Sequence, residues 1–290
     1  MFHYDIKTMQ ALLQTIVMAN CSAAGGQWLQ ERVNHNADLS WFNNSFAQLP
    51  RKTGRAIIQV TDAQAAQLQQ LYPGFYINGW TADRLARVWL LLQLDSSGKE
   101  KYFNSIESLF RSAAVNELVA LYSALPLLAY PELWRKRCAE GIRSNMGDVL
   151  ESIMYHNPYP AAQLDEPAWN QLVLKAIFTG KDIQYITGLD ERANPELAYV
   201  LSDFAHERWA AHRTVPPQLW RLSAKFIDDK IFPDIQKAMT DGDQETRQVI
   251  ALAIAQSPYA PATALLAAYP ALQEAIAANR LTWQTASITQ

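Results

Sequence analysis

The feature that most constrains the fold of this 290-residue chain is the helical spacing of its apolar residues. Nearly every segment repeats its apolar side chains every three or four positions, and the strict alternation typical of a half-buried strand is almost absent. The clearest exception is the short apolar run at residues 56–60, which ends at Thr61, a good helix N-cap. The pattern predicts an all-α protein, with an extended entry to a helix at this run.

The predicted helices follow one another with short turns between them. They cover residues 62–71, 82–94, 101–113, 115–128, 131–143, 146–156, 166–178, 195–213, 217–228, 232–239, 244–256 and 260–278. The Asn-Pro-Tyr-Pro segment at 157–160 breaks this series, because proline cannot sit inside a helix and forces extended geometry before it. Consecutive helices with short turns favour stacked antiparallel pairs, so we predict an irregular HEAT-like or α-solenoid array.

The domain organisation is predicted from the absence of linkers. No stretch rich in glycine, serine or charge interrupts the chain, so we expect residues 1–290 to form a single helical domain. The first sixty residues are its less certain part, and the polar residues 280–290 are expected to fray. Charged residues make up only 18% of the chain, against about 25% in typical domains. This deficit favours a deeply packed protein or a surface covered by a partner.

Charge and cysteine content disfavour several classes of protein. The net charge is −3 and there is no basic run, so the footprint of a nucleic-acid-binding protein is missing. No window approaches the ~20 apolar residues of a transmembrane segment. Cys21 and Cys138 are too few and too isolated for a disulfide scaffold or a cysteine zinc site. We therefore expect reduced thiols in a cytoplasmic protein.

The most informative segment is residues 203–213, where six ionisable side chains fall within eleven residues of a helix that is otherwise apolar. Because unpaired charge is costly in a core, the segment predicts either an internal ion-pair network or a polar site. The spacing from His206 to His212 is six positions rather than four, so it is not the zinc signature, and no metal site is predicted. The candidate site residues here are Asp203, His206, Glu207, Trp209 and Arg213.

Three further blocks supply candidate ligand-binding residues. The first holds Trp169, Asn170, Gln171 and Lys175, the second Asp190 and Arg192, and the third Asn157 and Tyr159. Gln171 and Lys175 share one helix face, and a lysine can serve an anion or a Schiff base, although a lone lysine on a helix is usually solvated. The second block also contains Gly188, which suits the C-cap of one helix, and Asn194, which suits the N-cap of the next. These two residues are explained by capping, which leaves Asp190 and Arg192 as a possible pair.

These blocks resemble the EboA domain family. The resemblance rests on Leu-Tyr-Ser-Ala-Leu-Pro at 121–126, Asn-Pro-Tyr-Pro at 157–160, Trp-Asn-Gln-Leu-Val-Leu-Lys at 169–175, Gly-Leu-Asp-Glu-Arg-Ala-Asn at 188–194 and His-Glu-Arg-Trp-Ala-Ala-His-Arg at 206–213. It runs from about residue 81 to residue 283, and the middle of the chain is its most specific part.

The resemblance implies a bacterial protein encoded beside a UbiA-like prenyltransferase and TIM-barrel or metal-dependent hydrolase-like proteins. Such clusters make or move a small metabolite, for which a prenylated compound is one option, and one cyanobacterial version is linked to getting a sunscreen-pigment precursor to the periplasm. The family carries no catalytic assignment over to this chain. Because its motifs coincide with the polar blocks, the resemblance favours one shared site over separate packing devices.

The interpretation we favour is a non-catalytic helical-repeat protein that binds a small molecule or a pathway enzyme encoded nearby. Its groove would be lined by Trp169, Trp209 and the polar blocks. A third interpretation is a structural scaffold in which every polar block is a satisfied ion pair. The sequence names no cofactor and no reaction.

An enzyme of unrecognised type is the second interpretation. His206 would act as general acid or base with Asp203 or Glu207 orienting it. Lys175 or Arg213 would hold an anionic substrate. This interpretation requires all these side chains to converge in one pocket.

Overall fold

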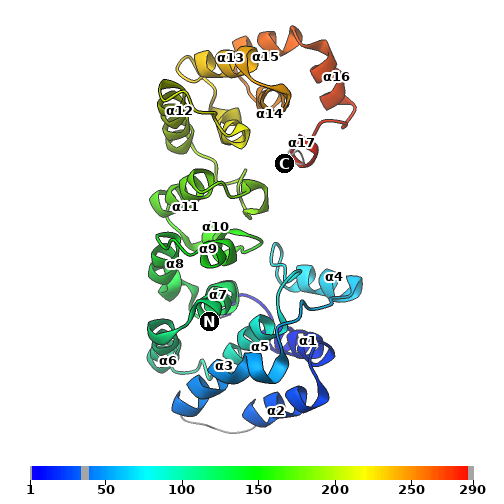
Figure 1. The fold of residues 1–290 in the computed structure, drawn as a ribbon, viewed down its shortest axis with the longest axis vertical. Coiled ribbons are helices and arrows are strands. Elements are labelled where there is room, and N and C mark those ends of the chain that lie inside the picture. The colour runs from blue at the N-terminus through cyan, green and yellow to red at the C-terminus, as the bar shows by residue number, and fades with distance from the viewer. Residues whose placement is uncertain (1, 34–38, 287–290) are drawn as a thin grey trace. The chain divides into compact units, whose positions relative to one another are not determined.

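The computed structural model describes residues 2–33 and 39–286, and the chain there is built from helices (Figure 1). No strand forms in these two ranges. The run at 56–60 is extended, with an isolated antiparallel bridge between Ile57 and Thr81. The Ile58 N–H donates to the Trp80 carbonyl at 2.9 Å. Both the all-α class and the extended entry are therefore confirmed.

The chain divides into two compact units, unit 1 at Met1–Ala168 and unit 2 at Trp169–Gln290. The boundary falls inside α11 (Glu166–Phe178). The expectation of one continuous domain stays a prediction.

Unit 1 is organised around one deeply buried helix, α5. The helices of the unit are α1 (Ile6–Ala19), α2 (Ala23–Val33), α3 (Leu39–Thr53), α4 (Asp62–Leu71), α5 (Ala82–Leu91), α6 (Lys99–Ser112), α7 (Val115–Ala124), α8 (Arg135–Ile142), α9 (Gly147–Met154) and α10 (Tyr159–Gln163), with 3-10 helices η1 (Leu125–Leu127) and η2 (Pro131–Trp134). Helix α5 packs against α1, α3 and α7, and α7 packs in turn against α9. A helix covered on so many sides is buried almost all round, which explains its apolar sequence.

A buried ion pair lies at the centre of unit 1. Arg87 of α5 is 2% exposed, and its guanidinium lies 2.6 Å from the carboxylate of Asp83 and 3.9 Å from that of Glu117. Its Nε–H also donates to the carbonyl of Phe46 at 3.1 Å. Desolvation lowers the pKa of Arg87, and the two carboxylates act in the opposite direction. The pair thereby links α3, α5 and α7 through one charge.

Unit 2 is organised around α14. Its elements are the rest of α11, η3 (Ile183–Tyr185), α12 (Pro195–Ala210), η4 (Pro217–Phe226), α13 (Phe232–Asp241), α14 (Gln244–Ala255), α15 (Ala260–Ala267), α16 (Pro270–Ala277) and α17 (Trp283–Ala286). Helix α14 contacts η4, α13, α15, α16 and α17, and Figure 1 shows it among the last helices of the chain. Residues 249–254 of α14 are all buried, as expected for a helix enclosed on every side.

Several predicted helices are interrupted where proline enters the pattern. The predicted helix 260–278 is two helices, because Pro270 lacks an N–H and its ring would clash with the carbonyl of Leu266. The predicted helix 115–128 ends at Ala124 and continues as a 3-10 turn that contains Pro126. The segment 217–228 is helical but 3-10 in type. In the tail expected to fray, residues 283–286 form α17, and 287–290 lie outside the described residues.

Both cysteines are free thiols. Cys138 is fully buried and Cys21 is half-buried. Burial raises the pKa of both thiols, so neither is a ready nucleophile. Within residues 2–33 and 39–286, no helix combines the length and apolar character needed to cross a membrane.

Candidate binding site

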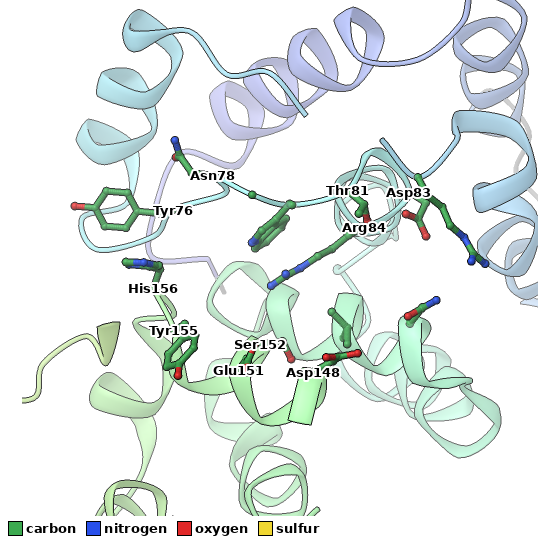
Figure 2. Close-up of a pocket in the computed structure, with 15 residues that line it drawn as sticks. Tyr76, Asn78, Thr81, Asp83, Arg84, Asp148, Glu151, Ser152, Tyr155 and His156 are labelled. Carbon is green, nitrogen blue, oxygen red and sulfur yellow. The ribbon is translucent and has the colours of Figure 1, made fainter. Parts of the chain in front are cut away.

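Unit 1 contains a pocket of about 460 Å³ (Figure 2). It is lined by Arg55 just after α3, by the loop before α5 and the first turn of α5, and by α7, α9 and the two residues that follow α9. This volume lies in the range of roughly 300–1,000 Å³ that is usual for small-molecule sites. The pocket lies wholly within one compact unit.

The walls of the pocket follow from helical spacing. Helix α7 supplies Asn116 and Val119, and α9 supplies Asp148, Glu151 and Ser152. Residues three or four apart share one face of a helix, so α9 presents a short polar stripe to the cavity and α7 presents one amide and one apolar side chain. The loop before α5 approaches from the other side through a left-handed turn at Gly79, whose φ is 78°. At that position a side chain would be strained, which explains the glycine.

Arg84 is the principal charged group of the pocket. Its guanidinium carbon lies 4.1 Å from the centroid of the Trp80 ring, and its Nε–H donates to the Ser123 hydroxyl at 2.9 Å. Figure 2 shows the side chain reaching across the pocket towards the side on which Ser152 lies. Desolvation lowers the pKa of Arg84 to about 9, with the charge of Asp83 opposing that shift. The guanidinium therefore remains charged at pH 7.

Arg84 lacks an ion-pair partner in the described part of the chain. No carboxylate there lies within 4.0 Å of its guanidinium, and its terminal amino groups donate no hydrogen bond to described residues. The neighbouring carboxylate of Asp83 is committed to Arg87. The terminal amino groups of Arg84 are therefore open to a ligand, while its Nε–H is engaged by Ser123.

An aromatic pair closes one end of the pocket. The rings of Tyr76 and His156 meet edge to face with their centroids 5.2 Å apart, and Figure 2 shows them opposite each other. The Tyr76 N–H also donates to the carbonyl of His156 at 3.4 Å. Desolvation lowers the pKa of His156, so the imidazole is neutral at pH 7. This end offers ring surfaces to a ligand rather than charge.

The lining of the pocket combines charged groups of both signs with aromatic rings. Ser152 donates its hydroxyl proton to the carbonyl of Val149 at 2.7 Å, so it is occupied within its own helix. Three carboxylates and two guanidinium groups line the cavity, belonging to Asp83, Asp148, Glu151, Arg55 and Arg84. Charges of both signs beside aromatic rings are what a small polar metabolite requires.

Two predicted site residues, Asn157 and Tyr159, lie in unit 1 but do not line the pocket. The Asn157 amide donates to the carbonyls of Tyr122 and Ser152 at 3.1 and 2.9 Å and accepts from the Tyr159 N–H. The Tyr159 hydroxyl donates to the carbonyl of Pro131 at 2.5 Å. Both side chains are buried and hydrogen-bonded within unit 1. Asn157 fixes the backbone next to His156 and so shapes the pocket indirectly.

The block at 169–175 divides into buried and outward residues in unit 2. Trp169 is fully buried with the Arg192 guanidinium 5.0 Å from its ring centroid. The side chain of Asn170 exchanges hydrogen bonds with that of Asn194 at 2.8 and 3.3 Å. Gln171 is exposed and Lys175 is half-buried. Trp169 and Asn170 therefore act in packing.

The predicted pair of Asp190 and Arg192 does not form. Asp190 instead accepts two hydrogen bonds from Arg221, at 2.8 and 2.6 Å, and its carbonyl accepts from Lys225. Arg192 is drawn to the ring of Trp169. Asp190 pairs with Arg221 instead of Arg192 because η4 places Arg221, 31 residues further along the chain, beside it.

The charged stripe of α12 faces outward. Asp203, Glu207 and Arg213 are exposed, whereas the opposite face of the helix buries Leu197, Leu201 and Ala205. Because these three side chains are exposed to solvent, their charges do not need the internal partners that the sequence suggested.

His206 has a partner other than those predicted. Its Nε2 lies 2.6 Å from a carboxylate oxygen of Asp234 in α13, in place of Asp203 or Glu207. Asp234 is 5% exposed and also accepts a hydrogen bond from Ser202 at 2.5 Å. Trp209 lies beside the imidazole, with a ring-centroid distance of 6.0 Å, and stacks on Trp220. Such a carboxylate fixes the orientation of the imidazole.

Sequence analysis missed the residues that dominate the pocket, chiefly Arg84 and Trp80. One signal could have found them. Asp83, Arg84 and Arg87 place three ionisable groups inside the apolar run 82–94, which is the criterion that singled out residues 203–213. Applied evenly, that criterion would have singled out α5 as well.

Comparison with known proteins adds a family to this geometry. The family model described as "Metabolite traffic protein EboA" matches residues 9–224. The match covers well over half of the chain and includes every residue that lines the pocket and every predicted site residue. Comparisons with curated proteins and with solved structures found no match. The resemblance seen in the sequence is thereby confirmed, and this chain belongs to the EboA family.

Proposed function

We propose that this protein binds a small metabolite in the pocket of unit 1 and serves metabolite traffic as a non-catalytic accessory protein. The observation that carries the proposal is the pocket itself, about 460 Å³ in volume and lined by aromatic rings and charged groups of both signs. The description of the family, a metabolite traffic protein, supports handling of a small molecule. A binding protein needs a shaped and partly polar cavity, and this pocket provides one.

The wider setting of the proposal comes from the family resemblance. A bacterial cluster with a UbiA-like prenyltransferase would supply a metabolite that carries or acquires a prenyl group, and the enzymes encoded nearby are the proposed protein partners. The free thiols Cys21 and Cys138 support a cytoplasmic location. A HEAT-like array of antiparallel helix pairs is the proposed architecture, and it is supported by the all-helical fold.

A matched pair of tryptophan substitutions tests the pocket. Asn116 and Val115 are both exposed in the first turn of α7, but Asn116 lines the pocket and Val115 does not. We expect Asn116→Trp to lower the retention of metabolites from a host extract by at least about 10-fold, because the indole would occupy the cavity. Val115→Trp should retain them like the wild type. Retention is measured by mass spectrometry after rapid desalting, with the melting temperature as a check on folding.

The outcome that contradicts this function is equally specific. If Asn116→Trp retains the same compounds as the wild type, the pocket is not where they bind. If both variants lose them equally, the effect belongs to the surface of α7 and not to the cavity.

A second candidate function rests on the His206–Asp234 pair of unit 2. We propose it as an acid–base site, because a buried carboxylate 2.6 Å from Nε2 orients the imidazole while 55% of the His206 side chain stays exposed. A carboxylate that orients a histidine is a recurrent element of general acid–base catalysis. The exposed charges of Asp203, Glu207 and Arg213 would flank this site.

Consumption of a compound by the protein distinguishes an acid–base site at His206 from a protein that only binds the compound. Wild-type protein incubated with host extract would consume a compound over time, and His206→Ala and Asp234→Asn would each abolish the consumption. His212→Ala, at an exposed histidine close by in the sequence, is the control and should leave it unchanged. A compound consumed equally by His206→Ala, or no consumption by the wild type, would remove this candidate.

A further inference from the structure

The guanidinium of Arg84 is held in place before any ligand arrives. Its Nε–H donates to the hydroxyl of Ser123, and that hydroxyl donates in turn to the carbonyl of Val119 at 2.5 Å. The guanidinium carbon lies over the ring of Trp80, 4.1 Å from its centroid. Because Ser123 engages Nε and Trp80 covers the guanidinium from one side, the edge formed by the two terminal amino groups is the part of Arg84 that a ligand can contact. A planar edge of this kind matches the two oxygens of a carboxylate.

Among residues 2–33 and 39–286, no carboxylate forms an ion pair with Arg84, although the charge of Asp83 acts on it from nearby. The adjacent carboxylate of Asp83 lies 2.6 Å from Arg87 and is engaged there. Desolvation already lowers the pKa of Arg84 to about 9, which shows that its charged form is disfavoured by its environment. A partly desolvated cation without a counter-ion is stabilised by any anion that reaches it.

The other charges of the pocket limit how much negative charge can enter. Asp148 and Glu151 of α9 line the same cavity, and Asp148 is exposed. Figure 2 shows both on the side of the cavity opposite the α5 loop. With Asp83 they make three carboxylates against the two guanidinium groups of Arg55 and Arg84, so the lining as a whole would repel a phosphate or a polyphosphate more strongly than a singly charged acid. The carboxylates of Asp148 and Glu151 would also accept hydrogen bonds from hydroxyl or ammonium groups elsewhere on the ligand.

We propose that the metabolite bound in unit 1 is a carboxylic acid with one negative charge, held end-on by the terminal amino groups of Arg84. Its less polar part lies towards the rings of Tyr76 and His156. This inference rests on the proposed function of the pocket and adds the chemical class of its ligand. Arg84 is accordingly the residue that determines specificity.

Esterification of the ligand tests the inference without altering the protein. The probe is the carboxylic-acid fraction of a host metabolite extract, offered to the full-length wild type before and after its acids are converted to methyl esters. We expect the wild type to retain a compound from the untreated fraction and to retain its ester at least about 10-fold less, because a hydrogen-bonded charge pair is lost.

Variants of Arg84 and its neighbour provide the matching change in the protein. Arg84→Gln should lower retention of the acid by about 10- to 100-fold and should bind acid and ester alike. Arg84→Lys keeps the charge without the planar edge and should lie in between. Ser123→Ala removes the acceptor for Nε, together with the hydroxyl's own bond to Val119, and leaves the charge of Arg84 in place. It should weaken retention by a few-fold, which gives a second result if Arg84→Gln does not fold.

The possible results are separable. If Arg84→Gln and the methyl ester both behave like the wild type with the acid, the anion site is wrong and the metabolite-binding function stands. If the retained compound is a phosphate or polyphosphate, the assigned ligand class is wrong. If the wild type retains nothing, the proposed function fails, and this inference fails with it.

Discussion

Replacing Arg87 with alanine is expected to lower the free energy of unfolding of unit 1 by about 3–5 kcal/mol. Arg87 is 2% exposed and compensates the buried carboxylate of Asp83 at 2.6 Å. The substitution leaves that carboxylate without its cation and the carbonyl of Phe46 without the donor 3.1 Å away. The loss is measured by urea unfolding, with hydrogen exchange of the α5 amides reporting on unit 1.

A double substitution isolates the cause. Asp83→Asn with Arg87→Met removes both charges of the close pair and should recover a large part of the loss, because the buried carboxylate of Asp83 is no longer left without its cation. Arg111→Ala, at an exposed arginine on α6, should stay within about 0.5 kcal/mol of the wild type. A loss below about 1 kcal/mol for Arg87→Ala would show that the ion pair does not hold α3, α5 and α7 together.

Trp169→Ala is expected to lower the free energy of unfolding of unit 2 by about 3–5 kcal/mol. The indole is fully buried, so its removal leaves a large cavity, and the guanidinium of Arg192 loses the ring 5.0 Å away. Trp169→Phe keeps a ring for both contacts and should lose clearly less. Fluorescence-detected urea unfolding would measure the loss.

Gln171→Ala is the control for this substitution. Gln171 belongs to the same sequence block but is exposed, so its replacement should change stability by no more than about 0.5 kcal/mol. A small loss for Trp169→Ala would contradict the packing role. It would return Trp169 to the candidates for ligand binding.

The helices of this protein could be predicted because their signal is local. Residues 62–71 and 166–178 are helical with the predicted bounds, since N-caps and spacing lie within the segments themselves. The predicted helix 260–278 failed at Pro270, a residue visible in the sequence whose effect was not weighed. Contacts between residues far apart in the sequence could not be predicted from local patterns. His206 pairs with Asp234, 28 positions away, and no local pattern indicates that contact.

The pocket escaped prediction for a related reason. Its walls come from four separated parts of unit 1, and each of them looks like an ordinary helix end or turn by itself. Residues 203–213 drew attention instead because charge in an apolar helix was taken to be buried charge. In the structure Asp203 and Glu207 of α12 are exposed, while Leu201 and Ala205 are buried. The sequence shows that the segment contains charged residues, but whether they face the core or the solvent depends on how the helix packs.

Native mass spectrometry of the full-length protein, purified gently from its own host, tests the central claim most directly. The account predicts the 32.7 kDa chain with the added mass of a small acidic metabolite. That added mass should be absent from Asn116→Trp and present in Val115→Trp. A bare wild-type mass, or an added mass that persists in Asn116→Trp, would contradict metabolite binding in the pocket of unit 1.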